Sequence, residues 1–350
     1  MVKILLMARM LLGTLSQRIK NLVKTNFIIK TTKSVNKSLE KPMKIPLLKT
    51  LLLSSIAALL LGLSSLAQAQ LKVTTTTGMI ADLVENIGQD KVSVQALMGV
   101  GVDPHLYKAT QGDIRKLARA DIIFYNGLHL EGKMQNIFDK MARKQTVIAV
   151  TEAIPEDKLI RYDQLHDPHV WFDVALWQQA VDKVANSLAN KDPKNADFYR
   201  QNSANYQQKL TQLNKWVQQE MAKVPADKRV LITAHDAFGY FGKAYGLEVM
   251  GLQGISTAGE FGLQDIKQLK DIIVQRGIEA VFVESSVSPK FIESLVKGVQ
   301  AEGRNLVVGG ELYSDAMGAK GSGADNYIGM VKHNVKTIRD GLLGKAGSHE

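Results

Sequence analysis

The chain has 350 residues, a formal net charge of +10 and no cysteine. This length is enough for about two domains of roughly 100–200 residues each. The lack of cysteine excludes disulfides and restricts any metal site to nitrogen and oxygen donors, which disfavours Cu(I) and iron–sulfur chemistry.

The positive charge is concentrated at the front of the chain. Residues 1–49 contain eleven Lys and Arg and one acid, Glu40, which leaves 33 basic and 33 acidic residues in 50–350. A neutral body lacks the basic surface that binds nucleic acid. We therefore expect no nucleic-acid partner.

Residues 43–69 have the order of features that is typical of a secretory signal peptide. Met43-Lys44 precedes an apolar run at 51–63, and Ala67-Gln68-Ala69 follows it. The run is too short for a membrane-spanning helix, which needs about 20 apolar residues. We expect cleavage after Ala69.

Residues 1–42 lie upstream of this complete signal, and we interpret them as an extension from an over-extended start; an unusually long n-region is the alternative. The cleavage site has no thiol that could carry a lipid, so we expect a mature protein without a lipid anchor. Export without an anchor would lose a protein from a cell with a single membrane. We therefore expect a location in the periplasm.

From Leu71 onward, short β-rich runs alternate with helical stretches, which is the signature of parallel α/β sheets. The first series predicts strands at 71–77, 92–98, 121–125 and 146–150, with helices at 79–87 and 110–119. Thr110, with Asp113 three residues later, predicts a capped helix start. The second series predicts strands at 229–234, 247–253, 280–284 and 305–309.

Between the two series, apolar residues recur at helical spacing over Pro193–Val224 without an internal glycine or proline. We predict one helix of about 30 residues, roughly 45 Å long. This linking helix would join an N-terminal lobe at 70–192 to a C-terminal lobe at 225–350 as a strut. The alternative is two helices with a break near Asn202–Asn205, because Ser and Asn are mediocre helix formers.

The tripeptide Asp-Pro-His occurs twice, at 103–105 and at 167–169. Proline fixes its own φ and biases the preceding residue toward extended geometry, so each histidine would leave a stiff turn. Two rigidly presented imidazoles suit a metal centre, since imidazole is a preferred ligand for zinc and its neighbours. Two ordinary surface turns are the alternative.

Ligands of open α/β sheets bind beyond the carboxyl ends of the strands. Four metal-ligating side chains follow predicted strands or open the interlobe segment: His105, His169, His235 and Asp315. Three imidazoles and one carboxylate fill a tetrahedral metal site, with two donors from each lobe. The pattern therefore predicts a metal site in the cleft between the lobes.

Three acidic residues are candidates to orient these imidazoles from behind, an arrangement that is common around protein metals. They are Asp167, Asp173 and Glu284, and surface ion pairing or helix capping is the alternative for each. Of the remaining histidines, we expect a structural role for His129, an entrance position or no role for His166, and solvated positions for His333 and His349.

Five motifs follow one another along 71–343. They are Asp-Pro-His at 103–105, Asn-Gly-Leu-His-Leu-Glu-Gly at 126–132, Asp-Pro-His-Val-Trp-Phe-Asp at 167–173, Thr-Ala-His-Asp-Ala-Phe-Gly-Tyr-Phe at 233–241 and Leu-Tyr-Ser-Asp at 312–315. Together they resemble the zinc/manganese solute-binding proteins of bacterial ABC transporters, the cluster A-I or TroA-like family. The resemblance implies two α/β lobes bridged by one long helix and a divalent metal held by His105, His169, His235 and Asp315.

The resemblance also implies a carrier rather than an enzyme: a monomeric periplasmic protein that delivers Zn²⁺ or Mn²⁺ to a membrane permease. The third ligand position of the family is a histidine in many zinc-type members and a glutamate in many manganese-type members, and here it is His235. The chain lacks the His-rich loop of many dedicated zinc members. The choice between zinc and manganese therefore stays open.

Two other functions compete with this interpretation. A secreted zinc hydrolase would keep one coordination position open for water, whereas four protein donors saturate a tetrahedral centre. The chain has no His-Glu-x-x-His helix, and Glu260 is the best candidate for a general base. A receptor for a siderophore or haem would need an open cleft with arginines or aromatics rather than four converging donors.

Overall fold

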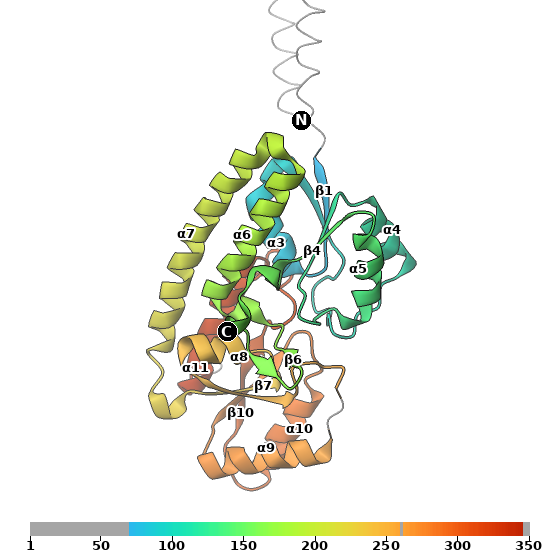
Figure 1. Cartoon of the computed structure of the whole chain (residues 1–350). Coiled ribbons are helices and arrows are strands. Elements are labelled where there is room, and N and C mark those ends of the chain that lie inside the picture. Colours follow the sequence, from blue (N-terminus) through green and yellow to red (C-terminus); the bar gives the residue numbers. More distant parts are fainter. Residues whose placement is uncertain (1–69, 260–261, 346–350) are drawn as a thin grey trace, which may run out of the picture. The chain divides into compact units, whose positions relative to one another are not determined.

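The computed structural model describes residues 70–259 and 262–345. The predicted signal peptide at 43–69, the upstream segment 1–42, Glu260 and His349 lie outside the described residues. The described chain is a mixed α/β protein with two lobes, each built on parallel strands (Figure 1). None of its helices is both long and apolar enough to cross a membrane.

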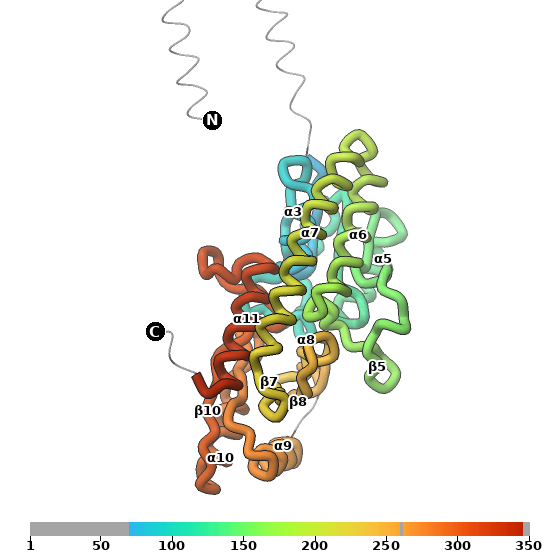
Figure 2. Tube along the Cα trace, turned by 90° about the vertical axis from the view of Figure 1, so that its left-hand side faces the viewer, coloured from blue at the N-terminus to red at the C-terminus, as the bar shows by residue number. Residues whose placement is uncertain are grey.

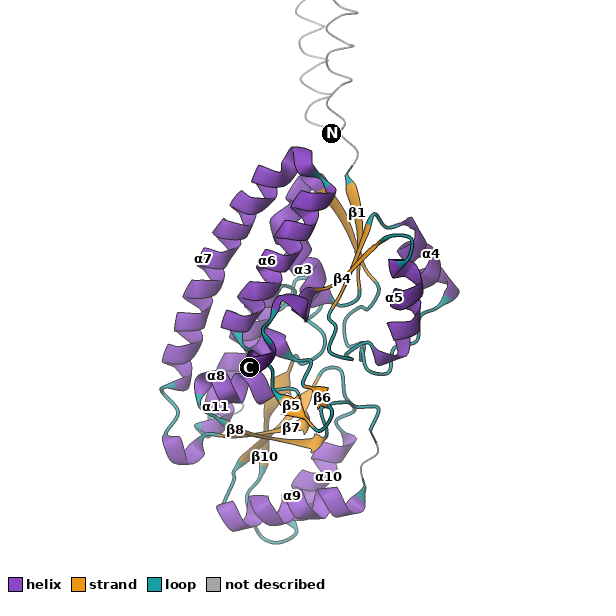
Figure 3. Cartoon of the chain, in the orientation of Figure 1, coloured by secondary structure: helices purple, strands orange, loops and turns teal. Residues whose placement is uncertain are grey.

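The N-terminal lobe is a four-stranded parallel sheet with the order β2-β1-β3-β4. Its strands are β1 (Leu71–Thr75), β2 (Val92–Ala96), β3 (Ile122–Tyr125) and β4 (Thr146–Ala149). Its helices are α3 (Gly78–Gly88), α4 (Gln111–Arg119) and α5 (Gln135–Ala142). α4 and α5 lie on one side of the sheet and α3 on the other (Figure 3).

The side chains of strand β3 show that both faces of this parallel sheet are buried. Ile122 and Phe124 join the core beneath α3, whereas Ile123 joins a separate apolar cluster with Leu117 and Phe138 on the opposite face. Successive side chains of a strand point to opposite faces, so a continuous apolar run requires that both faces be covered. The capped start of α4 is confirmed, because Thr110 and Asp113 form a reciprocal capping box.

The C-terminal lobe contains the parallel pairs β7–β8 and β9–β10, with β9 beside β7. Its strands are β7 (Val230–His235), β8 (Glu248–Gln253), β9 (Ala280–Glu284) and β10 (Val307–Leu312). Its helices are α8 (Gly239–Tyr245), α9 (Leu263–Arg276), α10 (Lys290–Gln300) and α11 (Tyr327–Leu342).

The last strand extends beyond its predicted end at residue 309. Its register against β9 shifts between Val308 and Gly310, and the strand continues to Leu312. Gly309 and Gly310 do not end the strand, and their lack of a side chain permits close packing of β10 against its neighbours. A Cβ on Gly309 would lie 2.7 Å from the Phe282 ring and 3.3 Å from Gly341 Cα.

The long helix predicted between the lobes is observed as α7 (Ala196–Met221), which follows a short 3-10 turn at Pro193–Asn195. It is continuous through the segment where a break was the alternative. The polar residues there are used in packing: Asn202 is buried, and its Nδ2 donates to Ile87 O at 2.9 Å. A buried, satisfied amide compensates for the low helix propensity of asparagine.

Helix α6 (Val174–Lys191) was not predicted, and it packs along α7. Figure 2 shows α6 and α3 beside one part of α7 and α11 and α8 beside the other. A single apolar core runs through this layer and includes Val73 of the first sheet and Leu231 of the second. The two lobes therefore share a continuous helical support.

Asp173 does not orient a ligand imidazole, contrary to one of the two expectations for it. Its side chain caps the start of α6 and accepts hydrogen bonds from the backbone N–H groups of Ala175 at 2.9 Å and Leu176 at 3.3 Å. The free N–H groups of a helix start are strong competitors for a nearby carboxylate.

Candidate metal centre

The four predicted metal-ligating residues lie together, and all four are buried. His105 follows β2 in a loop, His169 precedes the 3-10 turn Val170–Phe172, His235 is the last residue of β7, and Asp315 follows β10. One donor atom from each lies within 4.8 Å of all the others. His235 and Asp315 thus lie at or just beyond the carboxyl ends of parallel strands, where ligands of open α/β sheets bind.

The distances between the donor atoms suit one small cation. His105 Nε2 is 3.3 Å from His169 Nε2, and Asp315 Oδ1 is 3.4 Å from His169 Nε2. His235 Nε2 is 3.3 Å from Asp315 Oδ2. A tetrahedral site with Zn–N bonds of about 2.0–2.1 Å places its donors about 3.3–3.4 Å apart.

Two of the four donor side chains, His235 and Asp315, also have buried atoms without a hydrogen-bond partner in the part of the chain that the structure describes. Among the described residues, both carboxylate oxygens of Asp315 and Nε2 of His235 are buried without a hydrogen bond. Buried polar atoms normally have a partner, because an unsatisfied one costs free energy. A cation that accepts lone pairs from all four side chains would satisfy these atoms.

The turn that carries His169 is held from several directions. Asp167 Oδ1 accepts from the backbone N–H of His169 at 2.9 Å and lies 2.7 Å from its ring Nδ1. Asn126 Nδ2 donates to Pro168 O at 3.0 Å, and Tyr240 O–H donates to Asp167 O at 3.0 Å. The imidazole is therefore fixed with Nε2 pointing into the site.

The imidazole of His235 is fixed by the neighbouring strand β9. Glu284 Oε1 accepts from the backbone N–H of His235 at 2.8 Å, and Glu284 Oε2 lies 2.5 Å from its Nδ1. Both residues end adjacent parallel strands. A carboxylate on Nδ1 keeps the proton there and leaves the Nε2 lone pair available for a metal.

His105 is presented by the other Asp-Pro-His turn. Asp103 Oδ1 accepts from its backbone N–H at 2.8 Å, as Asp167 does for His169. The second oxygen of Asp103 does not contact the ring. It accepts instead from the Thr257 hydroxyl at 2.5 Å.

The three imidazoles differ in their acidity. Burial lowers the pKa of His105 to about 3. Burial also opposes the charge of His169, but the adjacent Asp167 carboxylate outweighs it and raises the pKa of His169 to about 9. In His235 burial is outweighed by the carboxylates Glu284 and Asp315, which raise its pKa well above the ordinary value.

The Asp315 carboxylate has the opposite shift. Burial would raise its pKa, but the nearby imidazoles of His235, His169 and His105 hold it well below the ordinary value. Asp315 is therefore anionic, and it is shared among three imidazoles. Protonated His169 and His235, whose pKa values are raised, balance this charge.

The remaining histidines lie outside the cluster. His129 is exposed in a turn with φ of 64°. His166 lies in a short hairpin of β5 (Arg161–Tyr162) and β6 (Leu165–His166), 3.8 Å from Glu156. His333 is exposed on α11, as expected.

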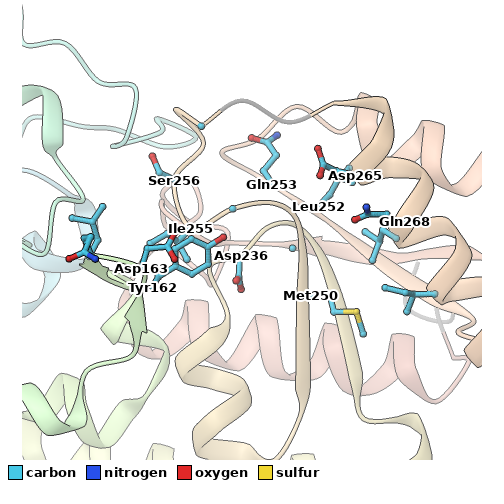
Figure 4. Close-up of a pocket in the computed structure, with 17 residues that line it drawn as sticks. Tyr162, Asp163, Asp236, Met250, Leu252, Gln253, Ile255, Ser256, Asp265 and Gln268 are labelled. Carbon is cyan, nitrogen blue, oxygen red and sulfur yellow. The ribbon is translucent and has the colours of Figure 1, made fainter.

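A pocket of about 750 Å³ lies between this hairpin and the β8–α9 region (Figure 4). Tyr162 lines it on the hairpin side, and Gln253 and Ser256 line it on the other. Asp236, the residue after His235, also lines the pocket, but the four donors do not. The pocket is a neighbour of the metal centre and not the centre itself.

Sequence reasoning missed the residues that hold the ligand turns. Glu131 is fully buried, and its carboxylate accepts from Thr76 O–H at 2.6 Å and from the backbone N–H of Asn126 at 2.8 Å. Asn126 in turn holds Pro168. The motif at 126–132, which contains Asn126 and Glu131, was recognised in the sequence. Its distance from His169 along the chain gave no reason to connect the two.

Four buried donors that converge from two α/β lobes joined by a long helix are the arrangement of a metal-binding solute-binding protein. Residues 73–341 match the family model described as ZnuA, zinc-uptake complex component A, periplasmic. The chain therefore belongs to this family, and the predicted family is confirmed.

Two curated relatives and one solved structure are closely similar. The manganese-binding lipoprotein MntA of Bacillus subtilis (strain 168) is 50% identical over 278 residues, which covers 79% of this chain and 91% of MntA. The zinc-binding protein TroA of Treponema pallidum (strain Nichols) is 49% identical over 267 residues, which covers 76% of this chain and 87% of TroA. The structure of the periplasmic zinc-binding protein TroA from Treponema pallidum matches with a TM-score of 0.77 and 48% identity, covering 78% of this chain and 99% of that chain.

These similarities confirm the two-lobed α/β fold. They also favour a component of a metal transporter over the hydrolase and chelate-receptor alternatives, because the family is one of uptake proteins and not of enzymes. One relative is named for manganese and the other for zinc. The comparisons therefore do not choose between the two metals.

Proposed function

We propose that this chain captures Zn²⁺ or Mn²⁺ with His105, His169, His235 and Asp315 and delivers the ion to the membrane permease of an ABC importer. The observation that carries the proposal is the convergence of four buried donor atoms within 4.8 Å of one another. Membership of a family of uptake components supports the transport role.

The donor set is compatible with both metals. Three nitrogens and one carboxylate suit zinc, and a carboxylate that binds through both oxygens would raise the coordination number for manganese. Affinity for such a site rises toward zinc along the Irving–Williams series, so zinc would bind tightly in vitro whichever ion is the cargo. Metal analysis of protein taken from its native compartment would identify the transported ion.

We propose the lobe boundaries 70–192 and 225–350, with the linking segment 193–224 between them. His105 then belongs to the first lobe and His235 and Asp315 to the second, so a bound ion cross-links the lobes. The continuous core along α6 and α7 supports a small closure rather than a wide swing.

We propose that the mature protein starts at Gln70 and acts as a monomer in the periplasm without a lipid anchor. The lack of cysteine in the 350 residues supports only the absence of a cysteine-linked lipid, and MntA is named a lipoprotein. Intact mass and N-terminal sequencing of exported protein test the processing site, and a mass that includes residues 1–69 or a lipid would contradict it. Light scattering of the purified protein tests the monomer.

A zinc titration of the purified mature protein tests the metal site. We expect one tightly bound equivalent in the wild type and loss of tight binding in Asp315→Ala, which removes the anionic donor. His129→Ala is the matched control, because it removes an exposed imidazole from a turn outside the donor cluster. One tight equivalent retained by Asp315→Ala would contradict the proposal.

A further inference from the structure

His105 is the least constrained of the three imidazoles. His169 and His235 each have a carboxylate oxygen within 2.7 Å of Nδ1, from Asp167 and Glu284. Among the described residues, no carboxylate pairs with Nδ1 of His105. The position of this ring therefore depends on the position of the turn that carries it.

The His105 turn reaches the C-terminal lobe through one side-chain hydrogen bond. Asp103 Oδ1 accepts from the His105 N–H at 2.8 Å, and Asp103 Oδ2 accepts from the Thr257 hydroxyl at 2.5 Å. Thr257 lies 154 residues further along the chain, in the loop between β8 and α9. One carboxylate thus joins the ligand turn to the opposite lobe.

A second contact lies beside this hydrogen bond. Gly101 has a φ of +69°, and a Cβ at this position would lie 3.4 Å from Ser285 O. Ser285 follows β9 in the C-terminal lobe. The loop that carries Asp103 and His105 is therefore held between two loops of the C-terminal lobe, and its fit depends on closure of the lobes.

We infer that Thr257 is a positioning residue of the metal site: its hydrogen bond to Asp103 keeps His105 on the ion and slows release of the metal. The inference rests on the proposed metal-binding function. Asp103 and Thr257 are half-buried, so water replaces this hydrogen bond when the lobes separate. The bond therefore acts on the closed, loaded protein and affects the release rate more than the rate of capture.

The size of the effect follows from the chemistry of the bond. A hydrogen bond to a charged group contributes more than one between neutral groups, and its loss corresponds to about a tenfold change in an equilibrium or rate. We expect Thr257→Val, which keeps the shape and removes the hydroxyl, to release zinc about tenfold faster. Thr257→Ser, which keeps a hydroxyl, should release zinc at close to the wild-type rate.

The experiment follows zinc transfer from the loaded mature protein to an excess of a chelating dye by stopped-flow. Ser256→Ala is the matched control, because the Ser256 hydroxyl oxygen accepts from the backbone N–H of Ala258 within the same loop and does not reach Asp103. Ser256→Ala should release zinc at the wild-type rate. Thr257→Ala provides a second variant that lacks the hydroxyl if valine prevents folding.

A double mutant tests the route through His105. In a His105→Ala background, the Thr257→Val substitution should have little further effect, because the residue that it positions is absent. The same acceleration in both backgrounds would overturn the assignment to His105. A wild-type release rate in both Thr257→Val and Thr257→Ala, or fast release by Thr257→Ser, would overturn the inference about Thr257. The proposed function is tested separately by zinc binding to the wild type. Absence of zinc binding by the wild type would overturn the proposed function.

Discussion

The two Asp-Pro-His turns have the same sequence and the same local geometry but different surroundings. In each, an aspartate oxygen accepts from the histidine N–H, at 2.8 Å for His105 and 2.9 Å for His169. The Asp167 carboxylate is buried and also supports its own histidine ring, whereas Asp103 uses its second oxygen to reach Thr257 in the other lobe. Local sequence determines the turn, and the tertiary position of the turn determines what the remaining oxygen does.

The same contrast separates two kinds of ligand. His169 and His235 are carboxylate-backed, which means that a buried acid lies against Nδ1 of each. His105 has no such acid among the described residues and has a pKa near 3 instead of a raised one. The carboxylate-backed rings are held through Nδ1, whereas the position of His105 depends on its turn and on the contact of Asp103 with Thr257 in the C-terminal lobe.

The largest expected difference is in the stability of the metal-free protein. His235→Ala leaves the buried Glu284 without its cationic partner, and breaking a buried pair costs about 3–5 kcal/mol of unfolding free energy. His105→Ala leaves no such charge and should cost much less. Urea unfolding of metal-free protein near neutral pH checks this. Equal losses of unfolding free energy in His235→Ala and His105→Ala would contradict the distinction between carboxylate-backed and unbacked histidines.

The acid behind His235 should itself control metal affinity. In Glu284→Gln an amide N–H₂ can face Nδ1, which favours the tautomer with the proton on Nε2 and blocks the donor. We expect zinc affinity to fall by about 10–100-fold, the usual cost of losing such a carboxylate. Competition titration measures it, and the exposed Glu279→Gln is the control. A wild-type affinity in Glu284→Gln would show that the contact between the Glu284 carboxylate and His235 does not affect metal binding.

The two kinds of ligand should also differ in their dependence on pH. The pKa of His169 is raised to about 9, so its protonated form stabilises the metal-free protein fully below its ordinary pKa near 6.5, and this stability is lost as pH rises through 9. Metal binding requires the neutral ring, so affinity rises with pH over the same range and the metal leaves as pH falls toward 5. Metal titrations from pH 5 to 9 check this.

His105 should contribute little to that pH profile, because its pKa lies near 3 and its ring is already neutral. We therefore expect His105→Ala to weaken binding at every pH and to keep the slope of log affinity against pH between about 6.5 and 9. A flattened slope in this variant would mean that His105 carries one of the displaced protons.

The smallest expected effect is on the overall dimensions. We expect the continuous core along α6 and α7 to restrict the approach of the His105 turn to a small movement. Small-angle scattering with and without zinc should give nearly equal radii of gyration. A change of several ångströms would show that α7 does not act as a strut.

The four candidate ligands could be selected from the sequence because each follows a strand or a proline turn, which are local features. The strands were found within a few residues, but β10 was ended too early, since Gly309 packs closely against Phe282 and Gly310 against Thr337 rather than forming a turn. Helix α6 was missed, although Asp173 caps its start.

The supporting contacts could not be read from the sequence in the same way. The pairing of Asp103 with Thr257 spans 154 residues, and that of Asn126 with Pro168 spans 42. Neither has a periodicity or a fixed spacing that would reveal it. Asp167 and Glu284 were identified as candidates only because acids are common behind ligand histidines. In the structure both carboxylates lie against Nδ1 of a candidate ligand, whereas Asp173 caps a helix.

The central claim is that four donors from the two lobes bind one ion. Anomalous diffraction at the zinc edge from crystals loaded with one equivalent tests it most directly. We predict a single strong peak about 2.0–2.2 Å from Nε2 of His105, His169 and His235 and from the Asp315 carboxylate. A peak that lies elsewhere, or an ion bound by His169, His235 and Asp315 with water in place of His105, would contradict the account.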